Sequence, residues 1–186
     1  MSERGGGPSG RLSKQDRRRA MWMLGAVELA ELLALGALEQ QMKRTGGPGI
    51  IPFELAGSSE RARRIMDTWG SEGRSAARLS LLLDYPFPAT YAPLHALACT
   101  ATADGFARRG RRTLAGAGGP LAWAQLAAAG FDYVENTALL LILSGRLGAL
   151  PALARRAALT KFVLISGGWG YILLGLGDAA WKRSSP

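Results

Sequence analysis

Carboxylates in apolar surroundings are the residues of this chain best suited to chemistry. Asp132 and Glu135 stand in a long apolar stretch, and Asn136 follows directly. These three positions share one face of a helix. Asp84 and Glu54 stand in two other apolar segments. Desolvation and mutual repulsion favour the neutral form of such groups, so a protonated acid beside an ionised one can donate a proton while its neighbour accepts one.

This pattern is typical of acid-initiated chemistry on an apolar substrate, such as alkene isomerisation or isoprenoid cyclisation. Aromatic faces near the acids would stabilise a cationic intermediate. The candidate catalytic residues are Asp132, Glu135, Asp84 and Glu54. The candidate substrate-binding residues are Asn136, Tyr85, Phe87, Tyr91, Phe131, Tyr133 and Trp169.

A structural role for the same face is the alternative. Asp132, Glu135 and Asn136 can instead join helices by hydrogen bonds to polar groups on neighbouring segments, each worth about 0.6 kcal/mol in a membrane. The available partners are Gln125, Tyr91, Ser166 and Thr137. The sequence leaves both interpretations open.

Several classes of site are excluded by composition. The 186 residues include one cysteine, Cys99, and one histidine, His95. An intramolecular disulfide, a cysteine-built zinc site and the histidine-rich zinc, copper and iron sites are therefore ruled out. We expect Cys99 and His95 to be packed residues, and we expect neither a metal nor another cofactor.

Four nearly uncharged stretches organise the chain, and a helix needs roughly 20 residues to cross the hydrocarbon core. They are residues 21–38, 79–103, 120–143 and 157–177. Their length and composition predict an all-α fold, a four-helix transmembrane bundle forming a single domain over residues 21–181. We expect a disordered basic tail at 1–20 and a polar tail at 182–186.

Charged and helix-breaking residues modify three of these spans. Glu28 and Glu31 make the first span the weakest: either it inserts, with both glutamates on one face directed into the bundle, or it lies in the membrane interface, and we expect insertion. Three prolines between residues 86 and 93 are expected to kink or delay the second helix. Lys161 lies four residues inside the fourth span, where we expect its side chain to reach the membrane interface.

The long connection between the first two spans has a pattern of its own. Residues 45–49 form a cluster of helix breakers, and Ser58 precedes an amphipathic run that ends at Gly70 or Gly73. Trp69 stands on the apolar edge of this run. The pattern predicts a short interfacial helix over residues 59–70.

Basic residues flank the spans, which accounts for the net charge of +9. Arg17, Arg18 and Arg19 directly precede the first span, and four arginines occupy the short connection at 108–112. This distribution favours lipid headgroups over nucleic acid as partners. By the positive-inside rule, we expect a cell-membrane protein with both termini in the cytoplasm.

Several short strings resemble a group of small, largely uncharacterised bacterial multi-pass membrane proteins. They are Phe53-Glu-Leu-Ala-Gly57, Trp69-Gly70, Leu83-Asp-Tyr85 with Phe87 and Tyr91, and Asp132-Tyr-Val-Glu-Asn136. The similarity covers residues 50–177 and implies a four-helix membrane fold without implying an activity. Small membrane cyclases of isoprenoid natural products also use buried acids in compact helical bundles, which is an analogy between types of site.

Two functions from different classes follow from these observations. The first is a membrane enzyme, of the isomerase or cyclase type, that acts on a lipid-like or isoprenoid substrate through buried carboxylates. The second is a non-catalytic protein: a small transporter, a lipid-binding protein or an accessory subunit with a partner in a membrane complex. Both functions involve membrane lipids and a hydrophobic small molecule rather than nucleic acid.

Overall fold

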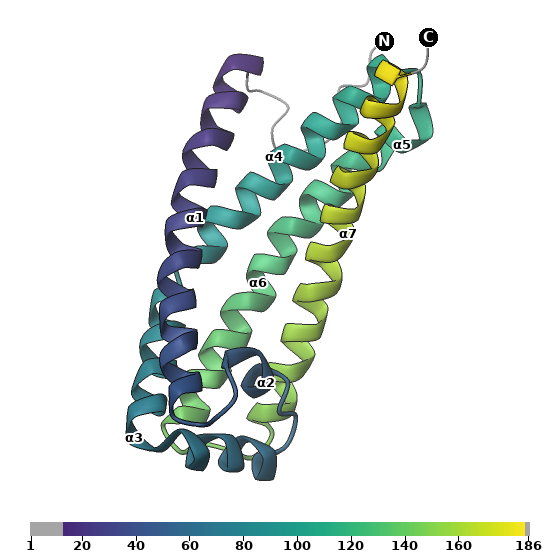
Figure 1. The fold of residues 1–186 in the computed structure, drawn as a ribbon. Helices are drawn as coiled ribbons and strands as arrows, with labels where there is room; N and C mark the ends of the chain where they lie inside the picture. Colours follow the sequence, from purple (N-terminus) through teal and green to yellow (C-terminus); the bar gives the residue numbers. More distant parts are fainter. Residues whose placement is uncertain (1–12, 185–186) are drawn as a thin grey trace. The chain divides into compact units, whose positions relative to one another are not determined.

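The computed structural model describes residues 13–184, and this part of the chain consists of helices joined by turns and loops, without strands (Figure 1). The helices are α1 (Lys14–Arg44), α2 (Ile50–Glu54), α3 (Ser59–Leu83), α4 (Phe87–Arg108), α5 (Arg112–Gly116), α6 (Gly118–Leu143) and α7 (Leu150–Ser184). The expected all-α fold class is therefore confirmed.

Three stretches of the described chain are long and apolar enough to cross a membrane. They are Lys14–Arg44, Arg112–Leu143 and Leu150–Trp181. They contain the spans expected at 21–38, 120–143 and 157–177. Three of the four expected spans therefore correspond to apolar helical segments that are long enough to cross a membrane.

The span expected at 79–103 is not one helix. α3 ends at Leu83 and α4 begins at Phe87, with a turn between them. Pro86 disfavours helical backbone at Tyr85, because the proline ring clashes with the preceding residue. Pro88 is tolerated in the first turn of α4, where a missing N–H breaks no helical hydrogen bond. The expected kink is thus a complete break, and it lies beside Asp84.

Both ends of the chain are more helical than expected. α1 begins at Lys14, because Ser13 Oγ accepts a hydrogen bond from the Asp16 backbone N–H at 3.1 Å and so caps the helix. Residues 14–20 of the expected tail are therefore helical, and residues 1–12 lie outside the described part. α7 continues to Ser184, so the expected polar tail at 182–186 is helical as far as it is described.

The described chain groups into two compact units. The terminal unit contains residues 13–25, 90–128 and 162–184, and the central unit contains residues 26–89 and 129–161. The long helices α1, α6 and α7 each contribute to both units. The sequence predicts one domain over these residues, and the grouping divides that domain at mid-helix positions.

In the central unit, α3 is divided at Gly70. The backbone there has φ 60° and ψ −156°, a conformation that is essentially restricted to glycine. Ser58 caps the start of α3 by accepting a hydrogen bond from the Arg61 N–H at 3.3 Å. The expected interfacial helix at 59–70 is therefore the first half of α3, and Figure 1 shows the second half running in a different direction.

Bulky apolar side chains form the core of the central unit. Met42 of α1, Phe53 of α2 and Trp69 of α3 are almost completely buried, together with Leu139 and Ile142 of α6. This core joins α2 and α3 to the C-terminal half of α6. The short helix α2 is therefore held by tertiary packing, since five residues are too few for a stable isolated helix.

In the terminal unit, ion pairs connect three helix ends. Arg17 near the start of α1 contacts Asp104 near the end of α4 at 2.7 Å. Arg109, directly after α4, contacts Asp178 near the end of α7 at 2.5 Å. The start of α1 and the ends of α4 and α7 therefore meet at one end of this unit.

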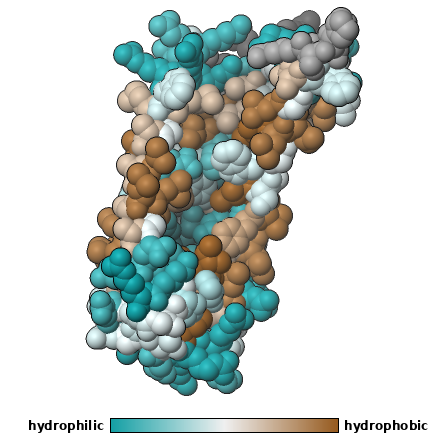
Figure 2. All heavy atoms as spheres, viewed as in Figure 1, coloured by the Kyte–Doolittle hydropathy of each residue, from teal (hydrophilic) through white to brown (hydrophobic). Residues whose placement is uncertain are grey.

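Large apolar side chains remain on the surface of the long helices, as Figure 2 shows. In the most apolar window of α1, only 6% of the residues are buried. Trp22, Leu29 and Leu33 of α1 are each more than half exposed, as are Val163 and Leu174 of α7. Such a surface is typical of helices that contact lipid rather than water.

Candidate acid–base site

The first acid of the site, Glu54, is placed by the chain that leads into α2. Glu39 of α1 accepts a hydrogen bond from the Ile50 N–H at 2.8 Å, which satisfies the free N-terminus of α2. Gly49 permits this approach, because a Cβ atom there would clash with the Glu39 carboxyl group. Glu54, the last residue of α2, is consequently directed inward.

Two aromatic residues hold α2 against α3. The ring centroids of Phe53 and Trp69 are 5.0 Å apart, and Trp69 Nε1 donates a hydrogen bond to the Pro48 carbonyl at 2.6 Å. The helix-breaking segment before α2 is thereby fixed to the first half of α3. Because a five-residue helix is not stable on its own, this support helps to hold the Glu54 carboxylate in position.

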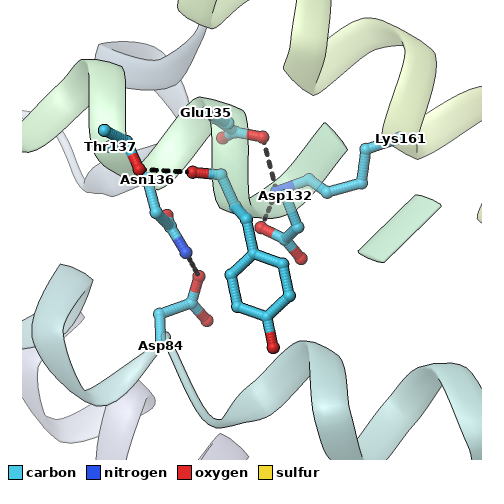
Figure 3. Close-up of polar contacts among 7 residues, drawn as sticks. Asp84, Asp132, Glu135, Asn136, Thr137 and Lys161 are labelled. Carbon is cyan, nitrogen blue, oxygen red and sulfur yellow. Dashed lines mark hydrogen bonds and ion pairs between the residues drawn. The ribbon is translucent and has the colours of Figure 1, made fainter. Parts of the chain in front are cut away.

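The second acid, Asp84, lies in the turn between α3 and α4. Asn136 Nδ2 of α6 donates a hydrogen bond to Asp84 Oδ2 at 2.7 Å (Figure 3). The neighbouring Tyr85 hydroxyl pairs with the Thr137 hydroxyl at 2.8 Å. At the break in the expected second span, a carboxyl group therefore meets the polar face of α6.

The remaining two acids, Asp132 and Glu135, share a single cation. Lys161 Nζ of α7 lies 3.1 Å from Asp132 Oδ1 and 2.7 Å from Glu135 Oε2 (Figure 3). Lys161 is only 7% exposed. The expectation that its side chain reaches the membrane interface is therefore wrong, because two buried carboxylates attract the ammonium group more strongly than a hydrated surface does.

Glu54 completes the group of acids. It is 8% exposed, and its Oε2 atom has no hydrogen-bond partner in the described chain. Burial raises the pKa of Glu54, the positive charge of Lys161 lowers it, and the Glu135 carboxyl lies within hydrogen-bonding reach. One lysine faces four acids in this group, so ionisation of all four would leave an uncompensated negative charge in a buried site.

Asp84 is also shifted toward its neutral form. Burial and the nearby negative charge of Asp132 raise the pKa of Asp84 to about 6, although the hydrogen bond from Asn136 opposes this effect. Its protonation therefore changes in a range where an ordinary aspartate is fully ionised. Burial therefore favours the neutral form of both Asp84 and Glu54.

The aromatic candidates lie in several parts of the fold. Phe131 and Tyr133 of α6 are 39% and 38% exposed, and the Tyr133 ring packs against the Tyr85 ring with centroids 6.0 Å apart. Phe87 is half-buried at the start of α4. Of the aromatic candidates, Tyr85 is the one tied by a hydrogen bond to the α6 segment that carries the acids.

Two further aromatic candidates, Tyr91 and Trp169, belong to the terminal unit and pack around His95. The ring centroids of Tyr91 and His95 are 5.5 Å apart, and those of His95 and Trp169 are 5.1 Å apart. Tyr91 and His95 are buried, whereas Trp169 is 46% exposed. The described arrangement is that of a packed aromatic cluster around a buried histidine.

The described residues contain no group of three or more His, Cys, Asp or Glu side chains arranged to hold a metal ion. The candidate site combines four carboxyl groups with one buried lysine, whose ammonium group contacts Asp132 and Glu135.

Lys161 is the residue of the site that sequence reasoning misjudged. Its own neighbourhood is uniformly apolar, which favours an interfacial interpretation. The better signal is the excess of acids elsewhere: a group of carboxylates within apolar segments requires a cation, and Lys161 is the one basic residue between 157 and 177. Counting charges across segments, rather than within each one, would have identified it.

Comparison with known proteins adds no further assignment. The chain matches no protein-family model, no curated protein and no solved structure. Its function must therefore be argued from the site itself.

Proposed function

We propose that this chain is a multi-pass membrane enzyme that isomerises or cyclises a lipid-like or isoprenoid substrate by acid–base catalysis at Glu54, Glu135, Asp132 and Asp84. The observation that carries the proposal is the buried Glu54 carboxyl, with one oxygen unpartnered, beside Glu135 and Lys161. In this scheme a protonated Glu54 donates the proton, and a carboxylate in contact with Lys161 accepts one.

Each group has a distinct role in this scheme. Glu54 protonates an alkene carbon, and Asp132 or Glu135 removes a proton from a neighbouring carbon, so that the double bond moves or a ring closes. Lys161 keeps the accepting carboxylate ionised, and Asn136 holds Asp84 in place. Tyr85 presents its ring near the acids, and the other aromatic candidates contact the apolar part of the substrate.

The same proposal includes a topology. The candidate spans α1, Arg112–Leu143 and Leu150–Trp181 cross the cell membrane, and α4 forms a fourth, shorter crossing. Both termini are cytoplasmic, consistent with the arginines next to α1 and between α4 and α5. The substrate enters from the lipid phase, which the exposed apolar surface of the helices favours.

Deuterium incorporation tests the reaction for any substrate that carries an alkene. Purified protein in detergent is incubated in D₂O with a lipid extract of the expression host, squalene and geranylgeraniol, and the lipids are analysed by mass spectrometry. Protonation of an alkene carbon by an exchangeable carboxyl group adds deuterium to the product. We expect Glu54→Gln and Glu135→Gln to reduce this incorporation at least ~100-fold, the usual size of an acid–base contribution.

Asp67→Asn and Glu72→Gln are the matched controls, because these acids are exposed on α3. They should incorporate deuterium at the wild-type rate. Equal incorporation by Glu54→Gln, Glu135→Gln and the wild type would contradict the proposal, as would wild-type protein that labels none of the lipids.

Proton-linked transport is the second candidate, and one observation favours it. Lys161 contacts two carboxylates one helical turn apart, so protonation of either carboxylate changes the position that the ammonium prefers. Liposomes loaded with a pH-sensitive dye distinguish this function. A transporter shows proton flux that Asp132→Asn abolishes, whereas the enzyme shows substrate conversion without flux.

A further inference from the structure

A groove on the second half of α3 lies apart from the acid residues of the candidate site. It has a volume of about 360 Å³ and is lined by Arg74, Ser75, Arg78, Leu79, Leu82 and Leu143. Five of these residues lie on one stripe of α3, at spacings of three or four residues. Leu143, the last residue of α6, closes the other side.

The basic half of the groove lacks an anion. Arg74 and Arg78 are exposed, stand one helical turn apart and repel each other at that spacing. Neither makes an ion pair with an acid in the described chain, and the positions three and four residues from each are not acidic. Arg74 Nε donates to the Gly70 carbonyl at 2.9 Å, which leaves its terminal nitrogens available.

Two other exposed basic residues of the central unit have an acid at this spacing. Arg64 pairs with Glu60 one turn earlier on α3, and Lys43 pairs with Glu39 at 2.9 Å on α1. Arg74 and Arg78, in contrast, are each other's neighbour at the four-residue spacing, where Arg64 and Lys43 have a glutamate. An external anion would therefore relieve a repulsion that the chain itself leaves in place.

The apolar half of the groove continues in the same direction along the helix. Leu79 and Leu82 are 48% and 53% exposed. The stripe thus changes from guanidinium groups to leucines within about 12 Å, the rise of about eight helical residues. A phospholipid has the same order of chemistry over the same distance, from its phosphate to the first part of its acyl chains.

We propose that this groove binds an anionic phospholipid. Arg74 and Arg78 hold the phosphate, and Leu79, Leu82 and Leu143 contact the acyl chains. A soluble phosphate would use only the arginines and would leave the adjoining leucines exposed, so the combined lining favours a lipid over a free anion.

The test uses the full chain in neutral detergent and measures lipid binding by native mass spectrometry and by the shift in Tm. The probe is phosphatidylglycerol, compared with phosphatidylcholine of the same acyl chains and with glycerol phosphate. We expect phosphatidylglycerol to bind in preference to both. The Arg74→Gln/Arg78→Gln variant should lose roughly 30-fold in affinity, the effect of two basic residues at about 1 kcal/mol each.

Arg61→Gln/Arg63→Gln is the matched control, because it removes two exposed arginines from the first half of α3. It should keep wild-type affinity, and both double variants should keep the wild-type Tm without lipid. Leu82→Asn should weaken phosphatidylglycerol and leave glycerol phosphate unchanged. Equal losses in both arginine variants, or equal binding of glycerol phosphate and phosphatidylglycerol, would overturn the proposal.

Discussion

Two ionic clusters of this protein have unequal numbers of positive and negative charges, and the excess is of opposite sign in the two. In the terminal unit, Asp178 is surrounded by a surplus of cations, with Arg109 at 2.5 Å and Arg111 at 3.5 Å. Arg109 also donates to the Gly175 carbonyl and lies over the Phe106 ring, and the Arg111 side chain is 55% exposed. In the central unit, Lys161 is surrounded by a surplus of acids, and all the contacting side chains are buried.

The difference concerns which charges can reach water. Excess positive charge at the Asp178 cluster is stabilised by solvent, so the cluster can serve as a fastening between α4 and α7. Excess negative charge at the Lys161 cluster is not solvated in this way. The carboxyl groups must therefore be protonated, or the folded state is destabilised. The first arrangement is suited to structure, and the second is suited to proton transfer.

Removing the central cation should have the largest effect. Lys161→Met leaves Asp132 and Glu135 buried without a positive charge, which typically costs about 3–5 kcal/mol. We expect a large drop in Tm in detergent and low yield of folded protein. Lys43→Met is the control, because Lys43 is half exposed in its pair with Glu39, and it should change the stability by less than about 1 kcal/mol.

A double substitution sharpens this result. Adding Glu135→Gln to Lys161→Met removes one of the two stranded charges and should recover part of the lost Tm. A Lys161→Met protein as stable as the wild type would show that the acids are already neutral. In that case, uncompensated charge would not destabilise the Lys161 cluster more than the Asp178 cluster.

The pH dependence of stability should show an intermediate effect from Asp84. Its pKa is raised to about 6, so the folded state keeps a proton that the unfolded chain releases near pH 4. The contribution of Asp84 to the free energy of unfolding is therefore greatest below about pH 4. It falls by at most roughly 3 kcal/mol as the pH rises to about 6. Above this pH, the contribution of Asp84 is constant.

Asp84→Asn isolates this contribution. Tm is measured between about pH 4 and pH 8 for the wild type and the variant, and the difference between the two curves should change mainly between about pH 4 and pH 6. Glu54 contributes to both curves and cancels in the difference, apart from its coupling to Asp84. A pH-independent difference would show that Asp84 ionises normally.

The smallest effect is expected in the terminal unit. Asp178→Asn removes a partly exposed carboxylate from a cluster in which both arginines retain other contacts or water. We expect a loss of about 1 kcal/mol, seen as a small decrease in Tm. A loss as large as that of Lys161→Met would mean that both clusters are equally closed to solvent.

Local patterns were sufficient for most of the secondary structure. The helix start at Ser58, the break at Gly70 and the apolar helices around 21–38, 120–143 and 157–177 follow from capping, glycine chemistry and composition. The continuous second span failed because Pro86 breaks the helix completely rather than bending it. Hydrophobicity alone does not distinguish a kink from a turn.

For the candidate site, the order of residues along the chain is enough to show which acids stand in apolar surroundings and that Asp132, Glu135 and Asn136 share a helix face. Helical periodicity is local, so it needs no partner. The packing of distant segments was needed to show that Asn136 binds Asp84 and that Lys161 turns inward to two carboxylates. The partners in these contacts lie in different segments. The strength of their attraction depends on the distance between them, and that distance is set by the tertiary structure.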